Sequence, residues 1–269
     1  MKKLLLLCSV LSLSVLWPGD AIAQLKIGGK KLNTAKLLDA GKDVAKAVTL
    51  SDRDIAQLSR EAVAWMDANN PVADETTEYG ARLKRLTEGI TEVDGLPLNF
   101  KVYKVADVNA FACGDGSIRV FSALMDLMDD DELMAIIGHE IGHVVHADTK
   151  HAMKNAYLAS AARNAAGAAE GSRLAKLSGS QLGELVTGFT DAQFSQKQEY
   201  EADEYGFEFS VKHGFSPYAM GNSLNKLVEL SKGAKASTVQ KMFSSHPDSE
   251  KRAARMKEKA DAHAAAQQQ

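Results

Sequence analysis

Two histidines and a glutamate form the pattern in this sequence that is best suited to chemistry. His139-Glu140-Ile141-Gly142-His143 is an HExxH segment, and histidines four residues apart on a helix can present both imidazoles to one zinc ion. Glu140 projects beside such an ion, where its carboxylate can hold a water molecule that zinc has acidified. The spacing therefore predicts a catalytic zinc site. The alternative is a surface helix that carries two histidines by chance.

A catalytic zinc site needs a third protein ligand, which must come from elsewhere in the chain. The best candidate segment contains Glu199 and Asp203, in a helix predicted over residues 191–213. The two residues are four apart and so share one face of that helix. Glu199 can bind the metal, while Asp203 can accept the free ring N–H of a ligating histidine and fix its tautomer. The alternative is that this acidic segment is a solvent-exposed helix face.

The elements that must position these residues are expected to be mainly helical. Asp129, Asp130 and Asp131 are expected at the start of the HExxH helix, where carboxylates stabilise the helix dipole; a calcium site is the alternative. Residues 99–105 predict a strand, and residues 109–113 and 117–121 predict a hairpin around a glycine-rich turn. Further helices are predicted over residues 52–69, over about 73–87 and after residue 247. Residues 159–183 predict either a loose helix or a mobile loop.

Several segments together resemble the gluzincin metallopeptidases of the CAAX prenyl protease and HtpX group. The matching segments are HEIGH at 139–143, EYEAD at 199–203, Asn109-Ala110-Phe111-Ala112 with Gly116-Ser117-Ile118, residues 124–138, and Ser244-Ser245-His246-Pro247 with Arg252. The likeness covers roughly residues 100–252. It is greatest to the exported bacterial members, since the transmembrane helices of the prenyl proteases are missing from this sequence.

This resemblance implies a fold and a set of residue roles. The fold is an α+β, mainly α, zincin-like catalytic domain with a small β-sheet and hairpin packed by the HExxH helix. The cofactor is one zinc ion per chain. The implied roles are zinc ligands for His139, His143 and Glu199, general base for Glu140, and orientation of a ligand for Asp203.

Two further histidines need separate interpretation. The resemblance places His246 near the cleft, where it could stabilise the oxyanion of a tetrahedral intermediate or bind zinc in a resting state. A plain loop histidine beside Pro247 is the alternative. His146 lies one turn beyond His143 and is expected to be structural, because Glu199 already completes the ligand set.

The predicted strand Asn109-Ala110-Phe111-Ala112 suggests how a substrate binds. An edge strand beside the metal can pair with an extended polypeptide through backbone hydrogen bonds, without demanding a particular sequence. That mode favours unfolded or flexible polypeptides; an ordinary sheet edge is the alternative. Cys113 is expected to be a small packed residue and not a nucleophile.

The N-terminus predicts export. Residues 2–3 are lysines, residues 4–16 are apolar, and Ala21-Ile22-Ala23 matches a signal-peptide cleavage site, so residues 1–23 are expected to be removed. Cys8 raises the alternative of a lipoprotein, but it lies too early in the apolar run. Residues 24–50 are expected to be a lead-in segment and residues 51–269 the peptidase domain. The expected compartment is the periplasm, with a membrane-peripheral form as a further alternative.

Composition limits the possible partners. The net charge of −3 and the scattered lysines and arginines give no basic block for nucleic acid. The sequence therefore predicts a zinc metalloendopeptidase that hydrolyses unfolded or misassembled envelope proteins in protein quality control, with possible contacts to outer-membrane assembly partners. The rival is a non-catalytic zinc-binding chaperone or scaffold for envelope protein assembly.

Overall fold

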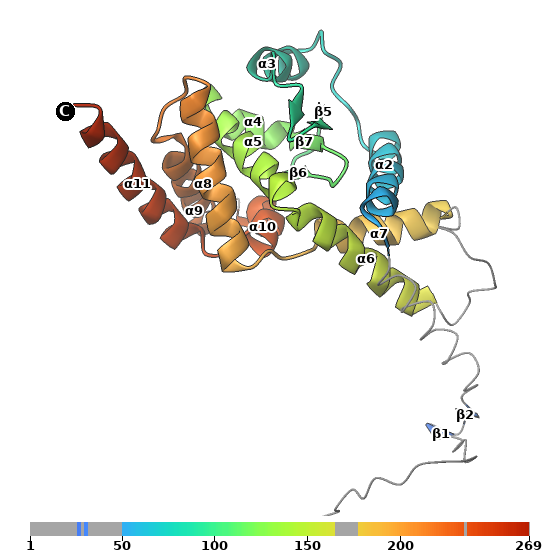
Figure 1. The fold of residues 1–269 in the computed structure, drawn as a ribbon. Helices are drawn as coiled ribbons and strands as arrows, with labels where there is room; N and C mark the ends of the chain where they lie inside the picture. The colour runs from blue at the N-terminus through green and yellow to red at the C-terminus, as the bar shows by residue number, and fades with distance from the viewer. Residues whose placement is uncertain (1–25, 28–29, 32–49, 165–176, 234–235, 269) are drawn as a thin grey trace, which may run out of the picture.

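The computed structural model describes residues 26–27, 30–31, 50–164, 177–233 and 236–268, and helices dominate them (Figure 1). The helices are α2 (Asp52–Asn69), α3 (Glu78–Leu86), α4 (Ser122–Leu127), α5 (Asp130–Val145), α6 (Asp148–Asn164), α7 (Gly179–Thr190), α8 (Gln196–Lys212), α9 (Ala219–Lys232), α10 (Ala236–Ser245) and α11 (Ser249–Ala266). The strands are β1 (Lys26–Ile27), β2 (Lys30–Lys31), β3 (Glu92–Val93), β4 (Leu96–Pro97), β5 (Asn99–Tyr103), β6 (Ala110–Ala112) and β7 (Ser117–Phe121). The expected α+β, mainly helical class is confirmed.

A small mixed sheet lies beside the central helix. Its strand order is β5-β7-β6, with β5 parallel and β6 antiparallel to β7. The expected hairpin is formed by β6 and β7. Its turn requires glycine, because Gly116 has a φ of +85° and a Cβ there would lie 2.1 Å from the carbonyl oxygen of Pro97. The other edge of β6 pairs with no strand in the described part of the chain, and β6 packs against α5.

Close packing of α5 against α8 creates the geometry of the site. A Cβ added at Gly206 of α8 would lie 2.9 Å from both the carbonyl oxygen of Ala135 and the backbone nitrogen of His139 on α5. Real Cβ contacts essentially never reach this distance. Glycine at this crossing therefore lets the two backbones touch, which brings residues 139–143 and residues 199–203 together.

Capping residues set the helix starts. Asp129 caps α5 by accepting a hydrogen bond from Glu132 N–H at 2.9 Å, and Glu132 accepts in return from Asp129 N–H. The acidic triplet thus caps the helix, as the sequence predicts. Ser195 likewise fixes the start of α8 at residue 196, not at the expected 191. Thr77 caps α3, which begins at residue 78 and not at about 73.

Some expectations fall on residues outside the described part of the chain. Within residues 159–183, the end of α6 and the start of α7 are described, and residues 165–176 are not. The predicted leader, residues 1–23, also lies outside, together with most of residues 24–50.

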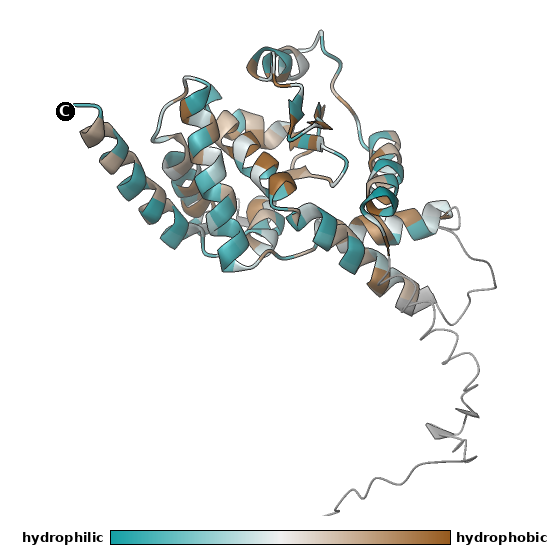
Figure 2. Cartoon of the chain, in the orientation of Figure 1, coloured by the Kyte–Doolittle hydropathy of each residue, from teal (hydrophilic) through white to brown (hydrophobic). Residues whose placement is uncertain are grey.

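Three apolar cores surround the metal-site helix. One joins the sheet to α4 and α5, a second joins α2, α6 and α7, and a third joins α8, α9 and α11 to Ala135 of α5. Figure 1 shows α2, α6 and α7 together on one side of α5, and α8, α9 and α11 on the other. Figure 2 shows strongly hydrophobic segments along α5 and mostly hydrophilic ones on α8. Among the described helices, none has both the length and the apolar composition of a membrane span.

Candidate metal centre

Four buried side chains meet where α5, α8 and the segment after α10 come together. His139, His143, Glu199 and His246 each offer one ligand atom, and these atoms all lie within 4.8 Å of one another. The Nε2 atoms of His139 and His143 are 3.1 Å apart, and Glu199 Oε1 lies 3.4 Å from His143 Nε2. Helical spacing brings the first two together, and the α5–α8 crossing brings in Glu199. The structure therefore unites the residues that the sequence predicts as ligands.

His139 is supported by a charged network on the α8 and α11 side. Its Nδ1 lies 2.9 Å from Asp203 Oδ1. Because an ionised carboxylate only accepts hydrogen bonds, Nδ1 carries the hydrogen and Nε2 faces the cluster. Arg252 of α11 donates to both oxygens of Asp203, at 2.7 and 2.6 Å, and its Nη1 pairs with Glu199 Oε2. Asp203 thus holds His139 as expected, and Arg252 balances the charges of both carboxylates.

Burial and these ion pairs shift the pKa values in the charged network. Burial lowers the pKa of His139 below its usual value, so this imidazole is neutral at pH 7. Burial alone would raise the pKa values of Asp203 and Glu199. The hydrogen bonds from Arg252 outweigh it at Asp203, and His246 and His143 outweigh it at Glu199, so both pKa values fall below the usual range. The site therefore keeps two ionised carboxylates in its interior.

His143 is supported differently, by the Asp148 carboxylate of α6 and by two neutral side chains near the start of α8. Its Nδ1 lies 2.9 Å from Asp148 Oδ2, and Asp148 Oδ1 accepts a hydrogen bond from Gln198 Nε2 at 2.6 Å. The ring of Phe194 stacks on the imidazole, with 4.0 Å between centroids and 17° between planes. Burial alone would lower the pKa of His143, but the Asp148 hydrogen bond and the Glu199 carboxylate outweigh it and raise the pKa to about 9.

Glu140 lies beside the ligand cluster. Its side chain is buried, and its Oε1 lies 3.8 Å from His246 Nε2. Among the described residues, this oxygen has no hydrogen-bond partner. A buried carboxylate oxygen that is left unpaired is costly unless another group, such as a water molecule, satisfies it.

The donor set fits zinc. Imidazole nitrogens and a carboxylate oxygen are ordinary zinc ligands, and a catalytic site uses three protein ligands and leaves one position open. His139, His143 and Glu199 can supply the three, and the free oxygen of Glu140 faces the remaining side beside His246. His246 offers a fourth donor, with Nδ1 3.0 Å from Glu199 Oε1 and 3.3 Å from His139 Nε2.

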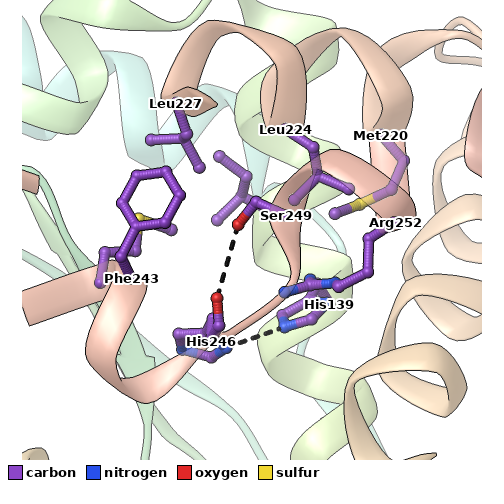
Figure 3. A pocket seen from close by; sticks show the side chains of 10 residues that line it. His139, Met220, Leu224, Leu227, Phe243, His246, Ser249 and Arg252 are labelled. Carbon is purple, nitrogen blue, oxygen red and sulfur yellow. Dashed lines mark hydrogen bonds between the residues drawn. The ribbon is translucent and has the colours of Figure 1, made fainter. Parts of the chain in front are cut away.

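An apolar pocket adjoins this cluster. Figure 3 shows His139, His246 and Arg252 along one side of it, with side chains from α9 and α10 around the rest. The apolar lining consists of Ile136, Met220, Leu224, Leu227, Met242 and Phe243. The free volume between these side chains is only about 10 Å³, roughly enough for one water molecule, so they pack closely beside the ligand cluster.

The other candidate residues lie outside the ligand cluster. Asn109 lies at the start of β6 and is buried, and among the described residues its Oδ1 has no hydrogen-bond partner. Ala110, Phe111 and Ala112 form β6. His146 is exposed at the C-terminal end of α5. Cys113 is fully buried, and burial raises the pKa of its thiol well above the usual value, which makes it a poor nucleophile.

Sequence reasoning missed several supporting residues. Asp148 follows His143 by five residues in the next helix, a spacing that no helical repeat connects with the ligand face. Phe194 and Gln198 were also missed, because the helix was predicted to begin at residue 191 and its true start at residue 196 was not recognised. A signal for Gln198 does exist, since Ser195 and Gln198 have the spacing of a capping box. Arg252 was noted as part of the matched His-Pro segment. That it pairs with the two carboxylates of Glu199 and Asp203 could be seen only in the folded structure.

Fold and site together define a zinc metallopeptidase of the HExxH type. The sequence profile of Peptidase family M48 matches residues 79–260. Similar proteins include the metalloprotease LoiP of Escherichia coli (38% identity, 90% of this chain and 94% of LoiP) and the metalloprotease YcaL of the same organism (37%, 85% and 88%). The beta-barrel assembly-enhancing protease of Yersinia pestis is 31% identical over 56% of this chain and 32% of its own length. The chain belongs to Peptidase family M48.

Proposed function

We propose that this peptidase is exported and cleaves unfolded or misassembled proteins of the cell envelope. In this proposal His139, His143 and Glu199 bind zinc and Glu140 is the general base. The observation that supports it best is the buried Glu140 carboxylate, whose Oε1 lacks a hydrogen-bond partner among the described residues. A chaperone or scaffold that only binds polypeptides has no need for an unpaired base beside its metal.

The reaction follows from the placement of these groups. When bound, zinc supplies Lewis-acid chemistry, polarising a carbonyl and lowering the pKa of water to about 7. Glu140 takes a proton from the attacking water and passes it to the departing amine. Asp203 keeps the hydrogen of His139 on Nδ1, so Nε2 stays available to the metal.

His246 has a role in the substrate-free protein. Its Nδ1 points into the ligand cluster, which supports binding of zinc in the resting state, and its Nε2 lies on the Glu140 side. With substrate bound, the same imidazole could instead donate a hydrogen bond to the oxyanion. Replacing it by alanine should change zinc affinity or turnover; a variant unchanged in both would remove both roles.

The free edge of β6 supports extended polypeptides as substrates. A chain that pairs with β6 needs no particular sequence, but it must be unfolded locally to present a strand.

The compartment rests on sequence and on relatives. Residues 1–23 have the features of a cleavable signal peptide, followed by a lead-in over residues 24–50 and a peptidase domain over residues 51–269. One relative is named for enhancing the assembly of β-barrels, which supports a role among envelope proteins and contact with their assembly partners. The periplasm is the compartment we propose.

Replacing Glu140 by glutamine tests the catalytic assignment. A protein lacking residues 1–23 should cleave casein, and Glu140→Gln should reduce the rate by a factor of at least about 10² to 10⁴, the usual contribution of a general base. Zinc content should stay at one ion per chain, because the amide replaces a group that does not bind the metal. Undiminished cleavage by this variant would contradict the role of Glu140.

The substrate class needs a separate experiment. The mature protein is incubated with an envelope proteome, native or heat-unfolded, with and without chelator, and the new chain termini are mapped. Chelator-sensitive termini should be enriched in the unfolded sample. Equal cleavage of native and unfolded proteins would contradict the edge-strand proposal. A protein that binds zinc and unfolded chains but cleaves none of them would instead be the chaperone or scaffold.

A further inference from the structure

The first turn of α8 does more than carry Glu199. Gln198 Oε1 accepts hydrogen bonds from the backbone N–H and the hydroxyl of Ser195, at 2.9 and 2.8 Å, which is the capping arrangement of this helix. The amide nitrogen of the same side chain donates to Asp148 Oδ1 at 2.6 Å, and Asp148 Oδ2 lies 2.9 Å from His143 Nδ1. An unbroken chain of hydrogen bonds therefore runs from the N-cap of α8 to His143.

Capping alone does not account for this arrangement. The same box opens α7, where Gln181 Oε1 accepts a hydrogen bond from Ser178 N–H at 2.9 Å. Among the hydrogen bonds of the described residues, none joins Gln181 to the metal cluster or to a carboxylate that touches it. The contact between Gln198 and Asp148 is thus an addition to an ordinary cap.

The direction of each hydrogen bond is fixed. Oε1 of Gln198 is occupied by Ser195, so only its amide N–H can point at Asp148. Asp148 then has one oxygen left, and it accepts the Nδ1 hydrogen of His143. With that hydrogen on Nδ1, the other ring nitrogen is free to bind metal. Phe194 packs on one face of the imidazole and fixes the plane of the ring.

We propose that Gln198 and Asp148 are positioning residues that set the tautomer and orientation of His143, and that one turn of α8 thereby supplies one zinc ligand and orients another. This inference rests on the proposed role of His143 as a ligand. Partners that orient a ligating histidine typically change metal affinity about 10- to 100-fold when they are removed. Neither residue touches the substrate or the metal.

A polarity exchange tests the proposal. In Asp148→Asn, the Gln198 amide still donates to residue 148, so the new amide nitrogen faces His143 and stabilises the wrong tautomer. In Gln198→Glu, two carboxylates face each other. In the double variant, Glu at 198 still caps Ser195 and accepts from Asn at 148, whose oxygen again accepts the Nδ1 hydrogen of His143.

The readouts are the zinc dissociation constant, measured by chelator competition, and the absorption spectrum of the cobalt-loaded protein. Each single variant should bind zinc about 10- to 100-fold more weakly and show an altered cobalt spectrum. The double variant should recover most of the affinity and the original spectrum. Gln181→Glu makes the same replacement in the α7 cap and should change neither.

The outcomes separate this inference from the assignment of the ligands. Unchanged zinc affinity in both single variants, or losses that simply multiply in the double variant, would overturn the positioning role. His143→Ala is measured in parallel. If that variant also keeps full zinc affinity, the proposed ligand set itself fails. Circular dichroism of the zinc-free proteins checks that every variant is folded, and recovery in the double variant cannot arise from a folding defect.

Discussion

The two histidines of the HExxH segment are held by two unlike surroundings. His139 depends on Asp203, which is fastened by the guanidinium of Arg252 in a fully buried network between α8 and α11. His143 depends on Asp148, whose partner is the neutral and half-buried Gln198. Loss of Arg252 leaves buried charge without its counter-ion, whereas loss of Gln198 removes only one hydrogen bond. We therefore expect the His139 side to dominate stability and the His143 side to dominate metal exchange.

The largest expected effect comes from removing the cation on the His139 side. Arg252→Met leaves Asp203 as an uncompensated buried charge and removes one partner of Glu199, and breaking a buried ion pair in this way typically costs about 3–5 kcal/mol of folding free energy. Urea denaturation of the zinc-free protein measures this loss. Arg255→Met is the matched control on the same helix, because Arg255 forms an exposed ion pair with Glu204 and should contribute at most about 1 kcal/mol. Equal losses in the two variants would refute the comparison.

A smaller effect is expected where α5 and α8 touch. Gly206→Ala places a methyl group 2.9 Å from backbone atoms of Ala135 and His139, so the helices must separate at a cost of about 1–3 kcal/mol. Separation also draws Glu199 away from the imidazoles and should weaken zinc binding. In the control Gly188→Ala, the nearest side-chain atom lies at an ordinary 3.4 Å. That variant should bind zinc normally and be unchanged or stabilised, by about 1 kcal/mol at most.

Removal of the metal should expose the difference in protonation between the two histidines. In the metal-free protein His143 keeps its proton up to pH about 9, whereas an unfolded histidine loses it near 6.5. The contribution of this proton to the free energy of unfolding is therefore complete below pH 6.5. It declines between pH 6.5 and about 9 and is absent above pH 9. His139 has a lowered pKa and adds no such decline.

Urea midpoints of the chelator-treated protein, measured at pH 6, 7.5 and 9, test this prediction. The urea midpoint should fall as the pH rises from 6 to 9. In His143→Gln the midpoint should fall less, because the contribution of the His143 proton is absent. Zinc needs the neutral imidazole, so zinc affinity of the unmodified protein should rise over the same pH interval. A variant with the same pH profile as the original protein would contradict the assigned proton.

Local patterns in the sequence were enough to predict the ligand-bearing elements. HExxH, the spacing of Glu199 and Asp203, and the glycine-rich turn at 114–116 each follow from helical or hairpin geometry within a few residues. The capping of α5 by Asp129 was predictable for the same reason. These features depend only on neighbours along the chain, and the structure reproduces them.

Features that depend on distant packing were not predictable. The partner of Asp203 lies 49 residues away on α11, and the contact between Asp148 and Gln198 spans 50 residues. No periodicity connects such positions. The start of α8 was misplaced because residues 191–194 continue an apparently helical composition, whereas the side chain of Ser195 fixes the boundary.

The position of Arg252 in the sequence also sets the order in which the buried charges are paired. Proteins are synthesised from the N-terminus, so residues 199–203 emerge before the cation that pairs with Glu199 and Asp203. A growing polypeptide therefore contains the carboxylates of Glu199 and Asp203 before the guanidinium that pairs with them. The charge balance of the site is therefore complete only once α11 packs against α8.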